Sequence, residues 1–318
     1  MADVVPRARL SNFPARSRAT VHGWPALLFG LPFAGLGGWV VLMAVGTIAI
    51  PPGSLHAPRW VLGVAGGTFG VAGLFLILHG LAGIVVKRRA ATIRQLRPGE
   101  PWLADHRWDP TRSRSAGFGR LAHQVVGLAF MAVFLAPFHW WAIAAGGGWF
   151  VGILVGLFDL ILIGALVHIV VQTARHCRHG RVTFRFDDFP FRAGEAVTGR
   201  LRLTQVSALD RLEVTLRCIE EAYEKRGSGD DQRDVVVCYE VHREALILDG
   251  PFDVSCLDGV PLVFDLPPDA PGTALLARPP RYWDLEVRGI APGPDVVAHL
   301  LVPVYESADQ VPSKRAAA

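Results

Sequence analysis

The sequence contains few charged residues and few cysteines. Only 19% of its 318 residues are Asp, Glu, Lys or Arg, whereas 51% are hydrophobic. This composition excludes a disordered chain, and it is too apolar for two ordinary soluble domains. The cysteines are too sparse for a disulfide framework and include no CxxC spacing. They are Cys177, Cys218, Cys238 and Cys256.

Charge is absent from long stretches of the first half of the chain. Residues 24–50 contain no charged residue over 27 positions, and about 20 helical residues suffice to cross a hydrocarbon core of about 30 Å. The same test selects residues 60–86, 121–145 and 149–171. The apolar region of the first segment is too long for a cleaved signal peptide. Residues 24–179 are therefore predicted to form a transmembrane domain of four helices.

Basic residues in the flanks of these spans predict their orientation, because Lys and Arg resist translocation. The segment 1–23 carries four arginines and the connection 87–120 carries nine basic residues, whereas the connection 146–148 carries none. Both termini and the loop 87–120 are thus expected in the cytoplasm, with the spans in a bacterial inner membrane. Four tryptophans fall at the predicted outer interface: Trp60, Trp140, Trp141 and Trp149.

The net charge is distributed unevenly along the chain. Residues 1–179 carry a net charge of +11 and residues 180–306 carry −8, so the overall +4 belongs to the flanks of the spans. Such basic flanks attract anionic lipid headgroups. A nucleic-acid-binding protein would need a basic surface on its soluble domain, and that domain is acidic. The sequence predicts a lipid bilayer as a partner and no nucleic acid.

Beyond Gly180 the apolar residues alternate with polar ones, as in Val182, Phe184 and Phe186. The same alternation recurs up to Tyr305, with turn-rich segments between the alternating runs and a polar loop at 224–233. Seven or eight short strands without a helical period predict an immunoglobulin-like β-sandwich over residues 180–306. Its cysteines are expected to be free in a reducing cytoplasm. Residues 307–318 are predicted to be a disordered tail.

The order of several short motifs in this region resembles an arrestin-like sandwich. They are FxxGE at 191–195, LPPDAPGT at 266–273, YWDLEV at 282–287, PGPD at 292–295 and LLVPVYE at 300–306. The loop PGEPWLADHRWDP at 98–110 resembles that of uncharacterised bacterial multi-pass membrane proteins with such a domain. The resemblance implies protein–protein binding and no catalytic residue or cofactor.

The leading hypothesis is therefore a non-enzymatic membrane protein that presents its sandwich to a protein partner as a scaffold, adaptor or assembly factor. Edge strands of the sandwich and the polar loop 224–233 are the expected contact surfaces. The adjacent acidic pairs Asp187-Asp188 and Glu220-Glu221 alternate between the two faces of a strand, and we expect them to be solvated.

Asp159 lies near the middle of the fourth span, where an ionised carboxylate is costly. Gly152 and Gly156 form a small-xxx-small pair on its helical face, so Asp159 is expected to point into the bundle. It is either a relay in a transport or proton-conducting component, or a protonated side chain that fixes helix packing. Gly66 and Gly70 in the second span also predict close helix packing, and such glycines allow a homo-oligomer.

Histidines offer a third hypothesis. His79, His123 and His168 lie in the inner parts of three spans and are either haem or metal ligands, with His79 and His168 as the haem pair, or amphipathic side chains. A local cluster at the end of the fourth span is weak as a zinc site and fits a basic collar that contacts lipid phosphates. Its potential ligands are His176, Cys177 and His179.

The loop 87–120 combines basic residues, among them Arg107, with the aromatic residues Trp102 and Trp108. This mixture is typical of a segment that lies at the inner headgroup boundary. The loop is equally suited to be a positive surface on which the acidic sandwich docks.

Overall fold

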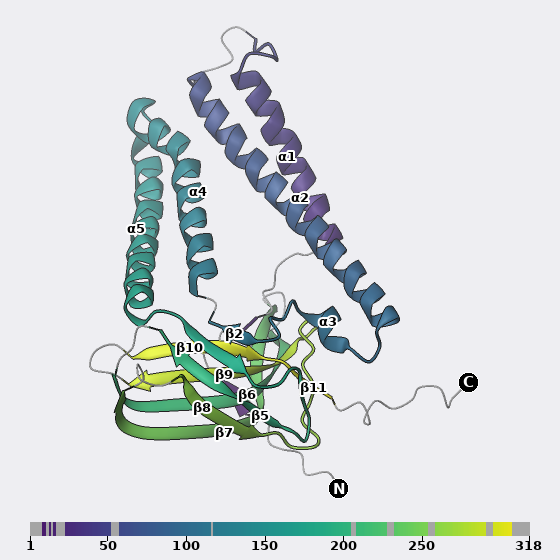
Figure 1. The fold of residues 1–318 in the computed structure, drawn as a ribbon. Coiled ribbons are helices and arrows are strands. Elements are labelled where there is room, and N and C mark those ends of the chain that lie inside the picture. The colour runs from purple at the N-terminus through teal and green to yellow at the C-terminus, as the bar shows by residue number, and fades with distance from the viewer. Residues whose placement is uncertain are drawn as a thin grey trace. The chain divides into compact units, whose positions relative to one another are not determined.

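The computed structural model describes residues 8–10, 13, 15–16, 23–51, 57–115, 117–204, 208–227, 232–253, 258–290 and 295–306. Cys256, the tail 307–318 and residues 228–231 of the polar loop lie outside these. The chain divides into two units (Figure 1). The helical unit comprises Val21–Arg88 and Phe118–Ala174, and the β unit comprises Met1–Thr20, Arg89–Gly117 and Arg175–Ala318.

Four helices in the described part of the chain are long and apolar enough to cross a membrane. They are α1 (Trp24–Ala44), α2 (Arg59–Leu96), α4 (Gly117–Ala144) and α5 (Gly148–His179). Helix α1 ends earlier than the charge-free stretch, because Gly46 adopts a positive φ of 83° that an α-helix cannot contain. Helix α2 continues ten residues past its predicted end at residue 86, through a basic segment rich in helix-forming residues.

Glycines bring the backbones of α1 and α2 into direct contact. A Cβ atom placed on Gly37 would lie 2.2 Å from the backbone nitrogen of Gly70 and 2.6 Å from the carbonyl oxygen of Gly66. The structure thus places Gly66 and Gly70 at a close helix contact, with Gly37 as their partner. The packing expected of Gly152 and Gly156 is not formed within the chain, because a Cβ at either position would meet no described atom within 4 Å.

The β unit is a sandwich of two antiparallel sheets (Figure 1). The five-stranded sheet has the order β1-β7-β6-β9-β10 and the four-stranded sheet the order β2-β3-β5-β8. The strands are β1 (Ala8–Leu10), β2 (Arg112–Arg114), β3 (Val182–Phe186), β5 (Ala196–Leu203), β6 (Ala208–Arg226), β7 (Arg233–Asp253), β8 (Val260–Asp265), β9 (Arg281–Ile290) and β10 (Val296–Val302). A parallel pair joins β4 (Phe191–Arg192) to β11 (Val304–Tyr305).

One hydrophobic core fills the space between the two sheets. The four-stranded sheet contributes Phe184 and Phe264, and the five-stranded sheet contributes Leu216 and Trp283, all of which are buried. Each lies on the face of its strand that points into the core, where every second residue is apolar, as the sequence pattern predicts. The indole nitrogen of Trp283 donates a hydrogen bond of 2.8 Å to the carbonyl of Pro271, so its one polar atom is satisfied inside the core.

Two segments that the sequence pattern treats as a tail and a loop are part of the sandwich. Residues 8–10 form β1 on the edge of β7, and residues 112–114 form β2 on the edge of β3. The segment before β2 contains the short helix α3 (Pro101–Asp105). Strands β6 and β7 are longer than the short strands that the sequence predicts, because they form one long hairpin that extends into the predicted polar loop.

Candidate functional site

The segment between α2 and α4 is held on the sandwich by a buried carboxylate. Asp105, at the end of α3, is 7% exposed. Its Oδ2 and Oδ1 atoms accept hydrogen bonds from the backbone nitrogens of Leu275 and Leu276, each at 3.0 Å. The hydroxyl of Tyr305 donates a third bond to Oδ2 at 3.4 Å. Asp105 therefore joins the segment between α2 and α4 to two distant segments of the β unit.

Both tryptophans of this segment contact Tyr305. The indole nitrogen of Trp108 donates to the Tyr305 hydroxyl at 2.9 Å, and the ring centroid of Trp102 lies 6.0 Å from that of Tyr305. Arg107 between them is exposed. The sequence left a lipid interface and docking on the sandwich open for this loop. Among the described residues, the docking contacts come from Asp105, from the two tryptophans and from the pairing of β2 with β3, rather than from the charge complementarity that suggested docking.

The outer face of the five-stranded sheet carries a second, smaller core. It contains Ile219, Cys238, Tyr282 and Leu301, with Trp108 packed against them. The N-terminal segment covers part of this face as well. The ring of Phe13 lies 5.4 Å from the ring of His299, and the guanidinium of Arg16 lies 5.0 Å above the ring of Tyr282. The described residues 8–10, 13 and 15–16 thus form a strap across the sheet.

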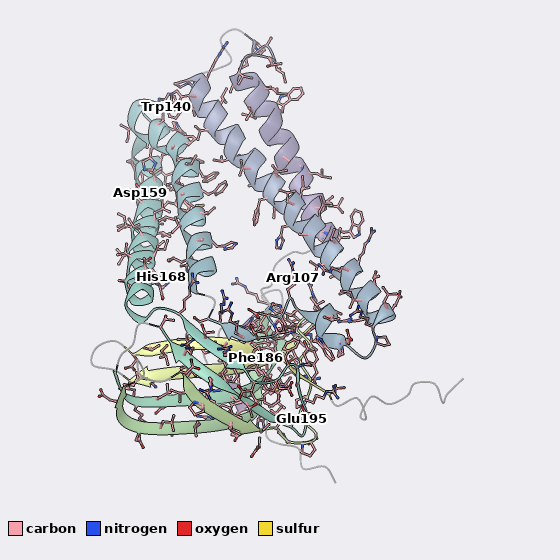
Figure 2. All side chains as sticks on the ribbon, in the orientation of Figure 1. Arg107, Trp140, Asp159, His168, Phe186 and Glu195 are labelled. Carbon is pink, nitrogen blue, oxygen red and sulfur yellow. The ribbon has the colours of Figure 1, made fainter. Side chains whose placement is uncertain are left out.

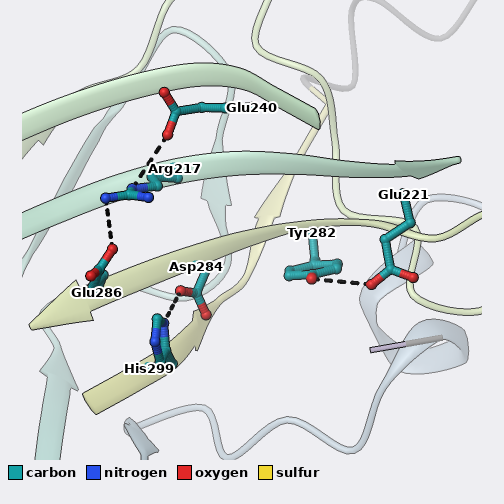
Figure 3. A network of polar contacts seen from close by, with 7 residues as sticks. All are labelled: Arg217, Glu221, Glu240, Tyr282, Asp284, Glu286 and His299. Carbon is teal, nitrogen blue, oxygen red and sulfur yellow. Dashed lines mark hydrogen bonds and ion pairs between the residues drawn. The ribbon is translucent and has the colours of Figure 1, made fainter. Parts of the chain in front are cut away.

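Beneath this strap lies a buried glutamate (Figure 3). Glu221 is 0% exposed and accepts hydrogen bonds from the Tyr282 hydroxyl at 3.2 Å and from the backbone nitrogen of Arg16. The expectation that Glu221 is solvated is wrong, because the strap and Tyr282 cover it. Asp187 and Asp188 are exposed, as expected.

The other acidic groups of this face are paired across strands (Figure 3). Arg217 on β6 forms ion pairs with Glu240 on β7 at 3.4 Å and with Glu286 on β9 at 2.7 Å. Asp284 and His299 are joined by a hydrogen bond of 2.7 Å between β9 and β10. Each carboxylate faces a cationic or hydroxyl partner, and the network therefore stabilises the sheet and its strap.

The Asp284–His299 pair should make the stability of the β unit depend on pH. Burial opposes protonation of His299, but the hydrogen bond to Asp284 and the nearby Glu286 carboxylate outweigh it and raise the pKa of His299. A raised pKa in the folded state stabilises the fold fully below about pH 6.5, the unfolded value. We expect this stability to be lost as the pH rises through the folded pKa of His299.

The measurement is the free energy of unfolding as a function of pH. We expect His299→Gln to cost about 2 kcal/mol at pH 6, because the buried Asp284 loses a charged hydrogen-bond partner. The difference between wild type and His299→Gln should shrink as the pH rises. Equal differences at pH 6 and at high pH would show that the charge of His299 does not contribute.

The helical unit contains a polar pair of its own. His139 of α4 and Asp159 of α5 lie 3.0 Å apart, measured from Nε2 to Oδ2, and Figure 2 shows Asp159 on α5. The Nδ1 atom of the same ring lies 2.9 Å from the carbonyl oxygen of Leu135. Asp159 thus faces the neighbouring helix, where its partner is a histidine. The close helix packing that was expected on this face of α5 is not formed there.

Sequence reasoning missed His139, although a signal for it was present. The turn centred on Gly147 folds α4 back along α5, so residues equally far from it lie at similar depth. His139 lies eight residues before Gly147 and Asp159 twelve residues after it. The difference of four residues corresponds to about one helical turn, which the two side chains can span.

The other histidines of the apolar helices have separate surroundings. His79 stacks on Phe75, with ring centroids 5.9 Å apart, and Nδ1 of His123 lies 2.6 Å from the carbonyl oxygen of Gly119 in its own helix. His168 lines an apolar groove of about 340 Å³ between α4 and α5.

A metal site is not assembled among the residues that the structure describes. They contain no group of three or more His, Cys, Asp or Glu side chains that could hold a metal ion. The side chains of the local cluster at the end of α5 lie outside the described ones, so the proposed collar stays a prediction. These are the side chains of His176, Cys177 and His179.

Two cysteines are described, and both are free and buried. Burial raises the pKa of Cys218 to about 12 and that of Cys238 to about 11. Both thiols are therefore protonated and unreactive near neutral pH.

The fold thus defines a protein with four apolar helices and a β-sandwich to which three separate chain segments contribute. No protein-family model and no curated protein matches the chain. Among solved structures with partial similarity is the sporulation control protein Spo0M from Bacillus subtilis. It has a TM-score of 0.28 and 15% sequence identity, and the match covers 39% of this chain and 48% of that chain, about half of its length. Nothing about function follows from a similarity at this level.

Proposed function

We propose that this protein is a non-enzymatic adaptor of the bacterial inner membrane. Its four apolar helices span the bilayer, and its arrestin-like sandwich lies in the cytoplasm and binds a protein partner. The observation that carries the proposal is an open side of the sandwich, at which two strand edges and partly buried apolar residues are available.

The chain segments that make up the β unit support the proposed membrane topology. Residues 8–10, 112–114 and the sandwich beyond residue 180 pair with one another in two sheets. These are the segments whose basic flanks predict a cytoplasmic location. These segments can meet only on one side of the membrane, so the number of spans between them must be even. Two apolar helices lie between β1 and β2 and two between β2 and β3, which satisfies that requirement.

The two sides of the sandwich differ. On one side β10 lies next to β2 and β3, so the edges of the two sheets approach each other there. On the other side are β8 and the part of β7 that lies beyond residues 238–240, with which β1 pairs. Leu246 and Leu248 of β7 are only partly buried against the main core, and Val263 in the middle of β8 is 59% exposed.

These edges are suited to strand addition, in which an extended segment of a partner pairs with an unpaired strand edge. Strand β8 pairs with β5 on one side, and no other described strand pairs with it. Its buried residues Val260, Leu262 and Phe264 hold it firmly in the core, whereas Val263 faces outward. We therefore place the partner-binding edge at β8, with Val263 at its centre.

The test compares two valines of nearly equal exposure on different edges. Val263 on β8 is 59% exposed and Val297 on β10 is 57% exposed. A photoreactive amino acid at position 263 of the full chain in its native membrane should give a discrete crosslinked product, and one at 297 should not.

A charge on the binding edge should weaken the complex. Val263→Lys is expected to lower the yield of the partner co-purified with the full-length protein about tenfold, which corresponds to about 1.4 kcal/mol. Val297→Lys is the matched control and should leave the yield within about twofold of wild type. Equal yields from the two variants, or a product from position 297 alone, would contradict the proposed edge.

A second candidate function is a small transport or proton-conducting component that uses Asp159. The specific observation in its favour is the hydrogen bond between Asp159 and His139, which gives the intramembrane carboxyl group a titratable partner. The shared protonation of this pair is a precondition for that function.

A further inference from the structure

The hydrogen bonds of His139 determine where one proton must be. Its Nδ1 atom lies 2.9 Å from the carbonyl oxygen of Leu135, and its Nε2 atom lies 3.0 Å from Oδ2 of Asp159. A carbonyl oxygen only accepts hydrogen bonds, so Nδ1 must be the donor and carry a hydrogen. This assignment leaves Nε2 to interact with the carboxyl group.

The contact between Nε2 and Oδ2 then requires one further proton. In a neutral ring with its hydrogen on Nδ1, Nε2 is an acceptor, and Asp159 must be protonated to donate to it. If Asp159 is ionised, Nε2 must carry the hydrogen and His139 is an imidazolium. Without this proton, two acceptors would face each other at 3.0 Å with no hydrogen bond between them.

Both hydrogen-bonded forms have a net charge of zero, whereas loss of the shared proton leaves a net charge of −1. The side chains of His139 and Asp159 are 38% and 40% exposed, so a large part of each faces whatever surrounds the α4–α5 hairpin. An uncompensated carboxylate in hydrocarbon is costly. The membrane environment that we propose for this hairpin therefore favours the form that retains the proton.

The other titratable groups of α4 and α5 lie farther along the helices. His168 is nine residues from Asp159 on α5, about 13 Å along the helix axis. His123 is sixteen residues from His139 on α4, about 24 Å along its axis. Neither is within hydrogen-bonding reach of the pair at these separations.

Helix α2 also packs against α4 near this level. The rings of Trp60 and Trp140 lie 6.5 Å apart. The charged residue at this end of α2 is Arg59. Its guanidinium lies near the end of α1, 3.5 Å from the position that a Cβ atom on Gly46 would occupy. The proton is thus left to be shared by His139 and Asp159.

We propose that His139 and Asp159 form a one-proton binding site in the helical unit, with the proton as its ligand. The site holds the proton jointly, and neither residue binds it in that geometry without the other. The proposal underlies the second candidate function, but it is independent of whether protons cross the membrane and of the adaptor function.

Nuclear magnetic resonance of the full-length protein in lipid nanodiscs tests this proposal. Histidine is labelled with ¹⁵N and aspartate with ¹³C, and the signal of His139 is assigned by its loss in His139→Gln. At neutral pH we expect a protonated Nδ1 and an Nε2 that is either protonated or hydrogen-bonded. On raising the pH, a bare Nε2 should appear in a single step, together with a change at the Asp159 carboxyl carbon.

The variants separate the pair from its surroundings. In Asp159→Leu the bare Nε2 should already be present at neutral pH, and the step should be lost. Asp159→Asn preserves the volume if the leucine variant fails to fold, and the shared step should be lost there as well. His168→Gln is the control and should keep it. A bare Nε2 beside an ionised carboxylate in the wild type at neutral pH, or an unchanged step in Asp159→Asn, would overturn the proposal. Crosslinking at position 263 reports separately on the adaptor function.

Discussion

Replacing Asp105 by alanine is expected to lower the free energy of unfolding of the β unit by about 3 kcal/mol. The carboxylate satisfies the backbone nitrogens of Leu275 and Leu276 in a place where Asp105 itself is almost completely buried. A buried hydrogen-bonding group that loses its partner costs about 1–3 kcal/mol, and this substitution leaves two of them. The measurement is chemical unfolding of the full-length protein in nanodiscs, followed by tryptophan fluorescence.

Two further variants make this result specific. Asp105→Asn has nearly the same volume, but its amide group can accept only one of the two backbone hydrogen bonds, so we expect it to lose about 2 kcal/mol. Asp109 is a matched aspartate in the same segment, exposed and bonded locally to Thr111 and Arg112. Asp109→Ala should cost about 1 kcal/mol or less. If the alanine variants at 105 and 109 were equally stable, Asp105 would not fix the segment to the sandwich.

The second large effect is expected in the helical unit, at Gly37. A methyl group at this position would lie 2.2 Å from the backbone nitrogen of Gly70 and 2.6 Å from the carbonyl oxygen of Gly66. Backbone atoms of a helix cannot rotate away, so α1 and α2 must move apart along the whole contact. We expect Gly37→Ala to destabilise the helical unit by about 3 kcal/mol, the upper end of the usual cost of overpacking.

Glycines of α2 provide the controls, because two of them have room for a side chain. A Cβ on Gly67 would meet no described atom within 4 Å, and one on Gly70 would first meet an atom at 3.8 Å. Alanine is favoured over glycine in a helix by about 1 kcal/mol. Gly67→Ala should therefore be neutral or slightly stabilising when both variants are compared by the same chemical unfolding in nanodiscs. A Gly37→Ala variant as stable as Gly67→Ala would contradict the close contact.

Long helices and strands with a regular pattern of apolar residues could be predicted from the sequence. Their apolar residues recur with the period of the helix or strand, because one face is apolar wherever it is buried or meets an apolar environment. The four apolar helices and the inward-facing residues of β3, β5 and β8 belong to this class. Strands β1 and β2 could not be predicted in this way. Three residues are too few to show a period, and the partners of β1 lie more than 220 residues away in the sequence.

The same reason explains the errors at individual residues. Glu221 has the polarity and spacing of a solvated strand residue, and it is buried by Tyr282 and by a segment from the other end of the chain. Asp105 lies in a basic loop whose charge suggested lipid contact, whereas its role depends on two amide nitrogens around residue 275. In contrast, His139 could have been found, because the short turn at Gly147 relates α4 to α5 locally.

The connections of the β unit have a consequence for how the chain is made. Strand β1 precedes all four apolar helices in the sequence and β2 lies between the second and the third, yet their partners β7 and β3 follow the fourth. On a ribosome that synthesises the chain from its N-terminus, residues 8–10 emerge long before β7 exists. The sandwich can therefore be completed only after every helix has been synthesised. A chain in which β1 and β2 fail to reach the rest of the β unit would leave β7 and β3 without these two edge strands.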